Sequence, residues 1–425
     1  MVNRDQSVRK VIDQLESDME LLGITGVEDK LQEDIRNTLD ALRNAGISVW
    51  MITGDKIETA TCIAISAGLK APFHDTYVIK EQTEPYSLQN KLNEFSMKMN
   101  TVLIIDGASI NTALNHQKEF FYNVACNAPA VVCCRVSPTQ KAVITEGVKI
   151  YTNKIVLGIG DGGNDVGMIQ AADVGVGIVG KEGKQAALAS DFSILKFKHL
   201  SKLLLWHGRL SYKNTSLMSQ FVIHRGLIIS IIQTIFSLVF YSIAIPIYNG
   251  YLMLGYTTVY TMFPVFCIVF DEDVDEAKAM DYPQLYQSLQ KGRELNIKTF
   301  LIWLWKSIYQ GSIIMFLSFT LFENTFIDIV TITFTALIII ELLNVYTTLT
   351  RINKIVLISQ ILTFVVYIAS IILFQQYIDV SVMDFAFAKK VALIVVLSWL
   401  PMHMVKLIRQ KYDPTENEKI MKDIK

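Results

Sequence analysis

Long apolar runs dominate the second half of the chain, and they limit the possible folds more than any other feature. A bilayer core is crossed by a helix of about 20 apolar residues. Several runs of that length carry one formal charge or none, and a shorter run around Val391–Ile408 is a sixth candidate. The predicted spans lie near 222–245, 252–270, 300–322, 327–346, 355–374 and 387–408. We therefore expect a multi-pass α-helical membrane domain, 206–425, after a soluble domain, 1–205.

Basic residues in the connecting loops predict the orientation of these spans. Lys and Arg gather before span one, between spans two and three, and after spans four and six, whereas Lys389 and Lys390 break the pattern. Cytosolic loops carry the excess of such residues. The soluble domain is therefore predicted to be cytosolic. The basic residues are Lys196, Lys198, Lys202, Arg209, Lys213, Lys278, Lys291, Arg293, Lys298, Arg351, Lys354, Arg409 and Lys411.

Acidic side chains are scarce inside the predicted spans. The first two contain no carboxylate, although a cation pump would be expected to bury oxygen anions there. Glu341 is the one acid inside the apolar run 329–346 of the fourth span. It is either a neutral or cavity-facing glutamate near a helix end or a functional group, and the sequence leaves both open.

The first two hundred residues alternate apolar strands with helical stretches. This alternation predicts a parallel sheet covered by helices on both faces, a Rossmann-like α/β domain. The expected strands are 48–52, 101–105, 130–134, 154–158 and 173–178. The polar stretch 71–100 is expected to be a surface excursion with one helix.

Two carboxylates follow one of these strands in the run Gly-Ile-Gly-Asp-Gly-Gly-Asn-Asp. Asp161 and Asp165 stand at the carboxyl end of the strand, among glycines that leave space around them. Ligands of parallel sheets bind at this edge, and Mg²⁺ is typically held by one or two carboxylates, waters and phosphate. The pattern predicts a magnesium site. Asp165 alone could instead cap a helix.

Two other strand ends supply groups that suit phosphate. Thr53-Gly54-Asp55 follows one strand and Arg135 ends another. Ser137 and Pro138 are typical of a helix start, which would direct Lys141 toward the same edge. Each basic residue alone is as well explained by a solvated surface position, but together they indicate a phosphate site.

Charge and cysteine content exclude some classes of protein. The formal net charge of −1 gives no sign of a nucleic-acid partner. The five cysteines lack the spacing of a disulfide framework, and Cys133-Cys134 is best explained by strand packing.

Several motifs carry a family resemblance. Thr-Gly-Asp, the lysine of Ser-Pro-Thr-Gln-Lys-Ala, and Gly-Asp-Gly-Gly-Asn-Asp resemble motifs two to four of the haloacid-dehalogenase superfamily, in the form of the P-type ATPase phosphorylation domain. Residues 26–32, 270–274 and 283–286 resemble type IV P-type ATPases, the phospholipid flippases, and most closely the branch that works without an accessory subunit.

The resemblance implies roles for particular residues. Asp161 and Asp165 are assigned to Mg²⁺, and with Thr53 and Lys141 they form the catalytic set. The residues implied in binding ATP and the phosphoryl group are Thr53, Gly54, Asp55, Arg135, Lys141, Asn164 and Asp165. The implied substrate is an aminophospholipid moved toward the cytosolic leaflet, in endosomal or Golgi membranes.

The chain also departs from the family pattern. It contains no Asp-Lys-Thr-Gly-Thr run, which carries the phosphorylated aspartate, and it lacks the nucleotide-binding and actuator domains and the first four membrane helices. We therefore expect a C-terminal part that forms no aspartyl-phosphate by itself. His224-Arg225 stand where many flippases have Tyr-Lys-Asn, so a headgroup role and a place at the membrane interface both stay open. The other interpretations are a cation-transporting P-type ATPase fragment and a non-catalytic truncated paralogue.

Overall fold

The computed structural model describes most of the chain. The described residues are 4–17, 19–20, 22–23, 31–180, 184–242, 244–290, 294–321, 325–351, 354–373, 378, 384–414 and 418–420. Residues up to Glu33 form a unit of their own, within which helix α1 spans Arg4–Leu15. The run 26–32 that resembles flippases lies mostly outside the described residues.

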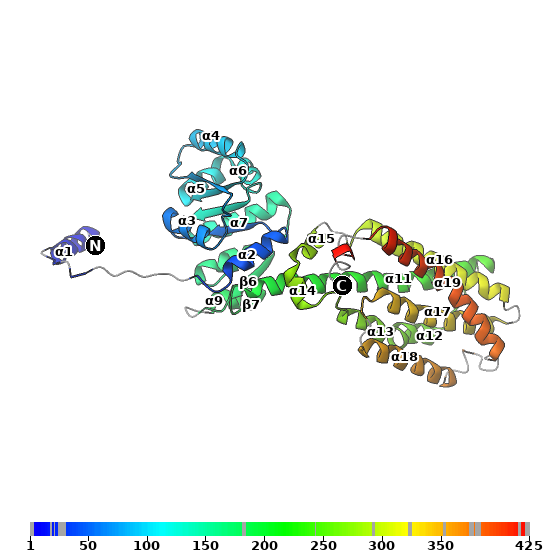
Figure 1. The fold of residues 1–425 in the computed structure, drawn as a ribbon. Coiled ribbons are helices and arrows are strands. Elements are labelled where there is room, and N and C mark those ends of the chain that lie inside the picture. Colours follow the sequence, from blue (N-terminus) through cyan, green and yellow to red (C-terminus); the bar gives the residue numbers. More distant parts are fainter. Residues whose placement is uncertain are drawn as a thin grey trace. The chain divides into compact units, whose positions relative to one another are not determined.

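A four-stranded parallel sheet forms the larger part of the soluble domain (Figure 1). Its strand order is β1-β4-β3-β2, and each neighbouring pair is parallel. The strands are β1 (Val49–Ile52), β2 (Asp75–Ile79), β3 (Thr101–Asp106) and β4 (Ala130–Cys134). The helices around it are α2 (Ile35–Asn44), α3 (Ile57–Ser66), α4 (Pro85–Ser96), α5 (Gly107–His116), α6 (Lys118–Ala125) and α7 (Pro138–Thr152).

Helices cover both faces of this sheet, as the sequence predicts. Along β3, Leu103 and Ile105 pack in a cluster with residues of α4 to α7, whereas Val102 and Ile104 pack with α2 and α3. Successive side chains of a strand point to opposite faces, so a strand buried on both sides is apolar throughout.

A second parallel sheet, in the order β5-β6-β7, completes the domain. Its elements are β5 (Leu157–Gly160), η1 (Gly163–Asp165), α8 (Val166–Ala171), β6 (Val174–Ile178), α9 (Gln185–Ala189) and β7 (Phe192–Ile194). Val49 of β1 and Leu157 and Ile159 of β5 border one apolar cluster around Leu42. Within the described residues, β1 and β5 each pair with one strand only, and both are half-buried while β3 and β4 are fully buried.

Two strands were not predicted. The expectation that 71–100 is a surface excursion is wrong, because β2 pairs with β3 and Leu88, Leu92 and Phe95 of α4 are buried. β2 is an edge strand, and its short run Asp-Thr-Tyr-Val-Ile lies within an otherwise polar stretch, which hid it from the prediction. β7 was missed because it is only three residues long.

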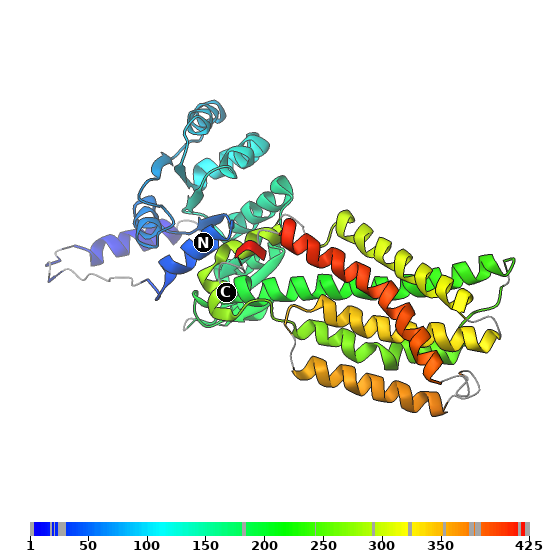
Figure 2. The same ribbon diagram turned by 45° about the vertical axis from the view of Figure 1, so that its right-hand side comes forward.

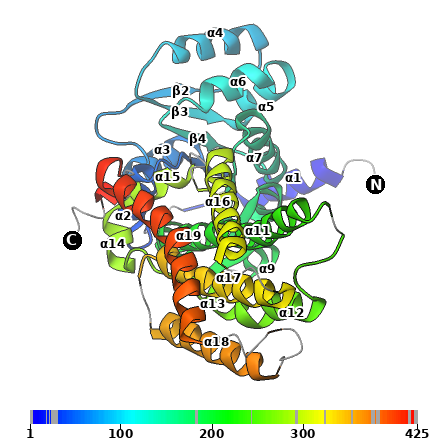
Figure 3. The same cartoon turned by 90° about the vertical axis from the view of Figure 1, so that its right-hand side faces the viewer.

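Six helices in the described part of the chain are long and apolar enough to cross a membrane, which confirms the predicted number. They run alongside one another in Figure 2. The helices are α11 (Arg209–Val239), the broken span Gly250–Phe270, α16 (Ile297–Leu321), α17 (Phe326–Thr348), α18 (Lys354–Leu373) and α19 (Phe385–Tyr412). α17 is the central one, since 72% of its apolar window is buried against 22–44% in the others (Figure 3).

Two of these spans differ from the prediction. The first ends at Val239, earlier than the predicted 245, and the left-handed backbone of Tyr241 and Ser242 turns the chain there. The second is broken into α12 (Gly250–Gly255), η3 (Tyr256–Tyr260), α13 (Met262–Phe266) and η4 (Cys267–Phe270). Thr261 marks the break, where its hydroxyl donates to the Tyr256 carbonyl at 2.5 Å.

A buried ion pair connects the start of the first span to the segment after the second. α10 (His199–Ser201) and η2 (Lys202–Gly208) lead continuously into α11, so the predicted boundary at 205 falls inside a helix. Arg209 donates two hydrogen bonds to Asp273, at 2.9 and 2.5 Å, and Lys213 adds a third at 2.8 Å. The short elements α14 (Glu276–Asp281), η5 (Pro283–Tyr286) and α15 (Gln287–Gln290) follow.

Asp271 completes this connection between loops. Its carboxylate accepts from the backbone N–H groups of Thr350 and Arg351 at 3.0–3.2 Å, in the segment after α17. The acidic run 270–274, which resembles flippases in sequence, therefore joins the start of α11 to the segment after α17.

Candidate functional site

The turn after β1 is fixed by its own side chains. The Thr53 hydroxyl donates to Asp55 Oδ2 at 2.8 Å and accepts from the Asp55 N–H at 3.1 Å. The backbone of this turn pairs with the end of β4, since Arg135 N–H donates to the Asp55 carbonyl at 2.9 Å. Thr53-Gly54-Asp55 and Arg135 thus lie side by side, and Gly54, Asp55 and Arg135 are exposed.

The helix after β4 begins as predicted. Ser137 and Gln140 form a capping box and Pro138 occupies the first turn of α7. One turn further on, Lys141 Nζ lies 2.7 Å from Asp165 Oδ1, and both side chains are mostly buried, at 12% and 14% exposed. This ion pair connects the two parallel sheets at their carboxyl edges.

The glycine-rich loop after β5 leaves a carboxylate free. Asp161 is exposed and makes no hydrogen bond or ion pair with any other described residue, and Asn164 is also exposed. Gly160 is needed for close approach, because a β-carbon there would lie 2.4 Å from that of Asp165. Asp165 occupies the N-cap position of α8, as the alternative expected, but its side chain accepts no capping hydrogen bond and pairs with Lys141 instead.

The donor set fits a magnesium ion that keeps several waters. Two carboxylates are available, Asp161 unpaired and Asp165 held by an ammonium group. Among the residues that the structure describes, no group of three or more acidic, histidine or cysteine side chains gathers as a complete metal cage. Mg²⁺ needs no such cage when phosphate and water supply the remaining oxygens.

A further carboxylate at this edge was not singled out from the sequence. Asp106 ends β3, but it is 2% exposed and accepts from the backbone N–H groups of Ser109 and Glu81.

Burial and the charges of Asp106 and Asp55 raise the pKa of the Cys134 thiol to about 11. Burial also raises the pKa of Cys133. Both thiols are therefore neutral and packed inside the domain, as the sequence predicts.

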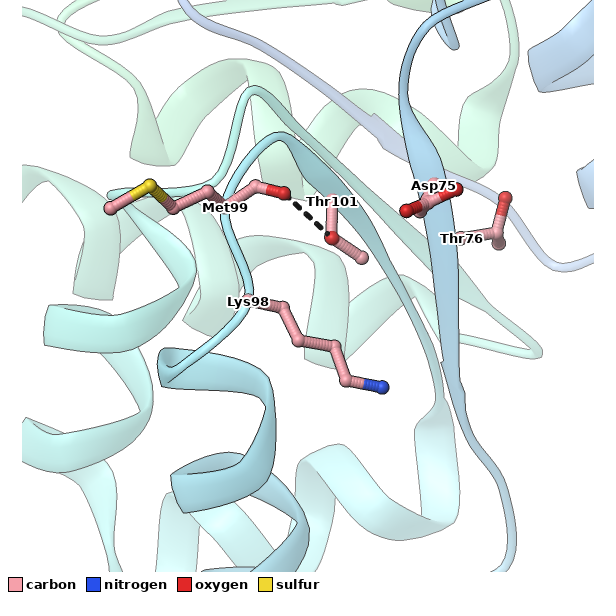
Figure 4. A pocket seen from close by; sticks show the side chains of 5 residues that line it. All are labelled: Asp75, Thr76, Lys98, Met99 and Thr101. Carbon is pink, nitrogen blue, oxygen red and sulfur yellow. Dashed lines mark hydrogen bonds between the residues drawn. The ribbon is translucent and has the colours of Figure 1, made fainter.

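A surface depression of about 490 Å³ lies at the opposite edge of the sheet (Figure 4). It is lined by Asp75, Thr76, Lys98, Met99 and Thr101, which surround the first residues of β2 and β3. Its lysine is engaged with Glu94 at 3.3 Å and with the Tyr77 ring. This depression is separate from the site built at the carboxyl ends.

The structure separates the two basic residues of the first span. His224 is fully buried, and its Nδ1 lies 2.6 Å from Ser307 Oγ. Arg225 instead donates to Thr261 Oγ1 at 2.6 Å, at the break in the second span. His224 therefore lies inside the helix bundle and does not extend toward water, as an interfacial side chain would.

Comparisons with known proteins agree with this architecture. Residues 187–415 match the family described as phospholipid-translocating P-type ATPase C-terminal, and residues 3–108 match haloacid dehalogenase-like hydrolase. The chain is 49% identical over 419 residues to a probable phospholipid-transporting ATPase IIB of Bos taurus, covering 98% of this chain and 37% of that protein. It is 45% identical over 425 residues to the phospholipid-transporting ATPase NEO1 of Saccharomyces cerevisiae, covering 99% and 37%. The chain thus spans little more than a third of these relatives.

Proposed function

Because this chain belongs to the phospholipid-translocating P-type ATPases, we propose that it is the C-terminal part of an ATP-driven flippase. The flippase would move aminophospholipid toward the cytosolic leaflet through an aspartyl-phosphate cycle. The observation that supports this most is the carboxyl edge, where the Lys141–Asp165 pair stands beside the unpaired Asp161.

Each side chain at this edge has a distinct task in the proposal. Asp161 and Asp165 would hold Mg²⁺, whose charge would offset that of the phosphoryl oxygens. Lys141 keeps Asp165 in place and adds positive charge near the phosphoryl oxygens. The Thr53 hydroxyl donates to a phosphoryl oxygen. Arg135, Asn164 and the backbone of Gly54-Asp55 bind the nucleotide side. Positioned charges are what phosphoryl transfer requires, more than covalent help.

The two sheets suggest where the phosphorylated residue would lie. β1 and β5 both have one open edge among the described residues, and both border the cluster around Leu42. Because an unpaired strand edge is a template for another strand, a strand of the same enzyme fits between them. Its carboxyl end would reach Thr53 and Asp161 together. We place the phosphorylated aspartate there, since the chain has no Asp-Lys-Thr-Gly-Thr run.

The six membrane helices provide the lipid path in this proposal, with the soluble domain in the cytosol. Arg225, which donates to Thr261 at the break of the second span, is the basic group that we assign to that path. Endosomal or Golgi membranes and independence from an accessory subunit follow from the resemblance to one flippase branch. Purification of the active complete enzyme without a second stoichiometric polypeptide would support its independence from an accessory subunit.

The ATPase activity of the complete enzyme that contains this chain tests the proposal. We expect aminophospholipids to stimulate ATP hydrolysis in mixed micelles, and Na⁺, K⁺ or Ca²⁺ to have no effect. Stimulation by an ion instead would support the cation-transporting interpretation. Activity in neither case, together with a complete gene that starts at Met1, would support the non-catalytic paralogue.

A further inference from the structure

Glu341 is buried in the centre of the helix bundle without a hydrogen-bond partner. It lies on α17, the most buried span, and is 1% exposed. Neither carboxylate oxygen accepts a hydrogen bond from a described residue. An ionised carboxylate in such a place is strongly unfavourable unless a cation or several donors compensate it.

The neighbouring histidine faces this carboxylate with its other ring nitrogen. His224 of α11 is fully buried, and its Nε2 lies 3.9 Å from Glu341 Oε1. Ser307 of α16 donates its hydroxyl to the Trp303 carbonyl at 2.9 Å, so it accepts from His224 Nδ1–H at 2.6 Å. The proton on the ring therefore belongs to Nδ1.

A pair of amides fixes the remaining nitrogen as an acceptor. Asn344 Nδ2 donates to His224 Nε2 at 3.3 Å and to Gln310 Oε1 at 3.0 Å, using both of its N–H groups. Gln310 Nε2 donates back to Asn344 Oδ1 at 3.3 Å. With these hydrogen bonds formed, no donor points from His224 to Glu341. Glu341 Oε1 and His224 Nε2 therefore face each other without a hydrogen atom between them.

The titratable side chains of the neighbouring elements have hydrogen-bond or aromatic-ring partners of their own. On α11, Arg225 donates to Thr261 Oγ1. On α16, Lys306 lies 4.7 Å from the centre of the Trp303 ring. On η3, the Tyr256 hydroxyl donates to the Arg225 carbonyl at 3.4 Å and also lies near the Glu341 carboxylate, without forming a hydrogen bond to it. On α19, Lys406 donates to the Thr347 carbonyl. On α18, the Tyr367 hydroxyl pairs with Thr335 at 2.7 Å. Lys306 and Arg225 act on Glu341 through space, but neither makes the missing hydrogen bond.

A proton suits this place better than a metal ion. His224, Ser307, Gln310, Glu341 and Asn344 are all at most 1% exposed. No further carboxylate, histidine or thiol in the described part of the chain joins the pair to form a metal site. A hydrated ion needs six or so oxygen ligands, whereas a proton needs only the two facing atoms.

We propose that Glu341 and His224 form a proton-binding site inside the membrane domain, which holds one exchangeable proton while α11, α16 and α17 are packed as seen. The proton comes from water, and on binding it forms an O–H bond at Glu341, which competes with the Asn344 N–H group for the lone pair of His224 Nε2. On release it returns to water and leaves a bare carboxylate. Because that carboxylate must be hydrated, release requires the three helices to part. The site does not depend on which lipid is carried.

Infrared difference spectroscopy of the complete enzyme in lipid nanodiscs tests the proposal. Between about pH 5 and about pH 9, where glutamate is ordinarily ionised, we expect a protonated carboxyl C=O band. The band should exchange slowly in D₂O, shift with ¹³C-glutamate and disappear in Glu341→Gln. Asp328→Asn removes another buried acid of the same helix and should keep the band. A wild-type spectrum without a slowly exchanging, ¹³C-glutamate-sensitive band overturns the site, whether or not the Gln variant folds.

Two further measurements test whether the bound ion is a proton and whether His224 takes part in binding it. Exchange of Na⁺ for K⁺ or choline at constant pH should leave the band unchanged, and a change would overturn the proton in favour of a metal cation. His224→Gln should shift the pH at which the band is half lost. An unchanged midpoint in this variant overturns the pair.

Discussion

Replacing Asp273 by asparagine tests the connection between the first span and the segment after the second. The substitution keeps the shape but removes the charge that faces Arg209 and Lys213. The side chains of Arg209 and Asp273 are only 2% and 8% exposed. Breaking a buried pair from one side typically costs about 3–5 kcal/mol, because the remaining charge stays buried without its partner. For a domain of this size that corresponds to a fall of roughly 6–20 °C in the unfolding midpoint.

Thermal unfolding of the complete enzyme in detergent, followed by a thiol-reactive dye, measures this fall. Asp275→Asn is the matched control. Asp275 also pairs with an arginine, at 2.6 Å from Arg351, but this pair is exposed and should contribute little. Equal midpoints for wild type and Asp273→Asn would refute the account of a buried connecting ion pair.

The same pair predicts a pH dependence. Burial alone would raise the pKa of Asp273, but the hydrogen bonds and charges of Arg209 and Lys213 outweigh it and hold the pKa well below its usual range. A carboxyl group whose pKa is lower in the folded state stabilises the fold at any pH above its unfolded-state pKa, about 3.9. This stabilisation is lost as the pH falls below that value toward the folded-state pKa. Wild type should therefore lose its advantage over Asp273→Asn in acid, below about pH 4.

Three other substitutions or labels test the soluble domain. Lys141→Met should lower ATP turnover by at least about tenfold, because it removes a positive charge that stabilises the phosphoryl group in the transition state. Lys149→Met breaks an exposed ion pair and should leave ATP turnover unchanged. Gly160→Ala should impair Mg²⁺-dependent activity, because the new methyl would lie 2.4 Å from the β-carbon of the acid that pairs with Lys141. At neutral pH a maleimide should label the exposed Cys62 and leave Cys134 unlabelled until the domain unfolds, as mass spectrometry of the peptides would show.

Strands β3 and β4 could be predicted because they are buried on both faces. β3 and β4 are continuous apolar runs, and the polar residues that follow them end each run sharply. Helix α7 was predictable from Ser137 and Pro138, whose capping geometry is local. The position of Lys141 relative to Asp165 followed from the rule that parallel strands share one ligand-binding edge.

Most of the missed features depend on contacts that the sequence does not show locally. β2 is recognised as a strand only through its pairing with β3, and its own residues are half exposed. The break at Thr261 comes three residues before Pro264, whose missing N–H is a local sign of a helix break that the prediction did not use. His224 looked like an interfacial residue because its partners, Ser307 and Asn344, come from helices far along the chain.

The role of the carboxyl edge in lipid movement is tested most directly in proteoliposomes. The measurement is ATP-driven transfer of a fluorescent aminophospholipid between leaflets by the complete enzyme, compared with Asp165→Asn and with Asp173→Asn, whose acid pairs with Lys149 away from the site. We predict transfer by wild type and Asp173→Asn and none by Asp165→Asn. Transfer that continues at the wild-type rate in Asp165→Asn would contradict the assignment of Mg²⁺ and the phosphoryl group to this edge.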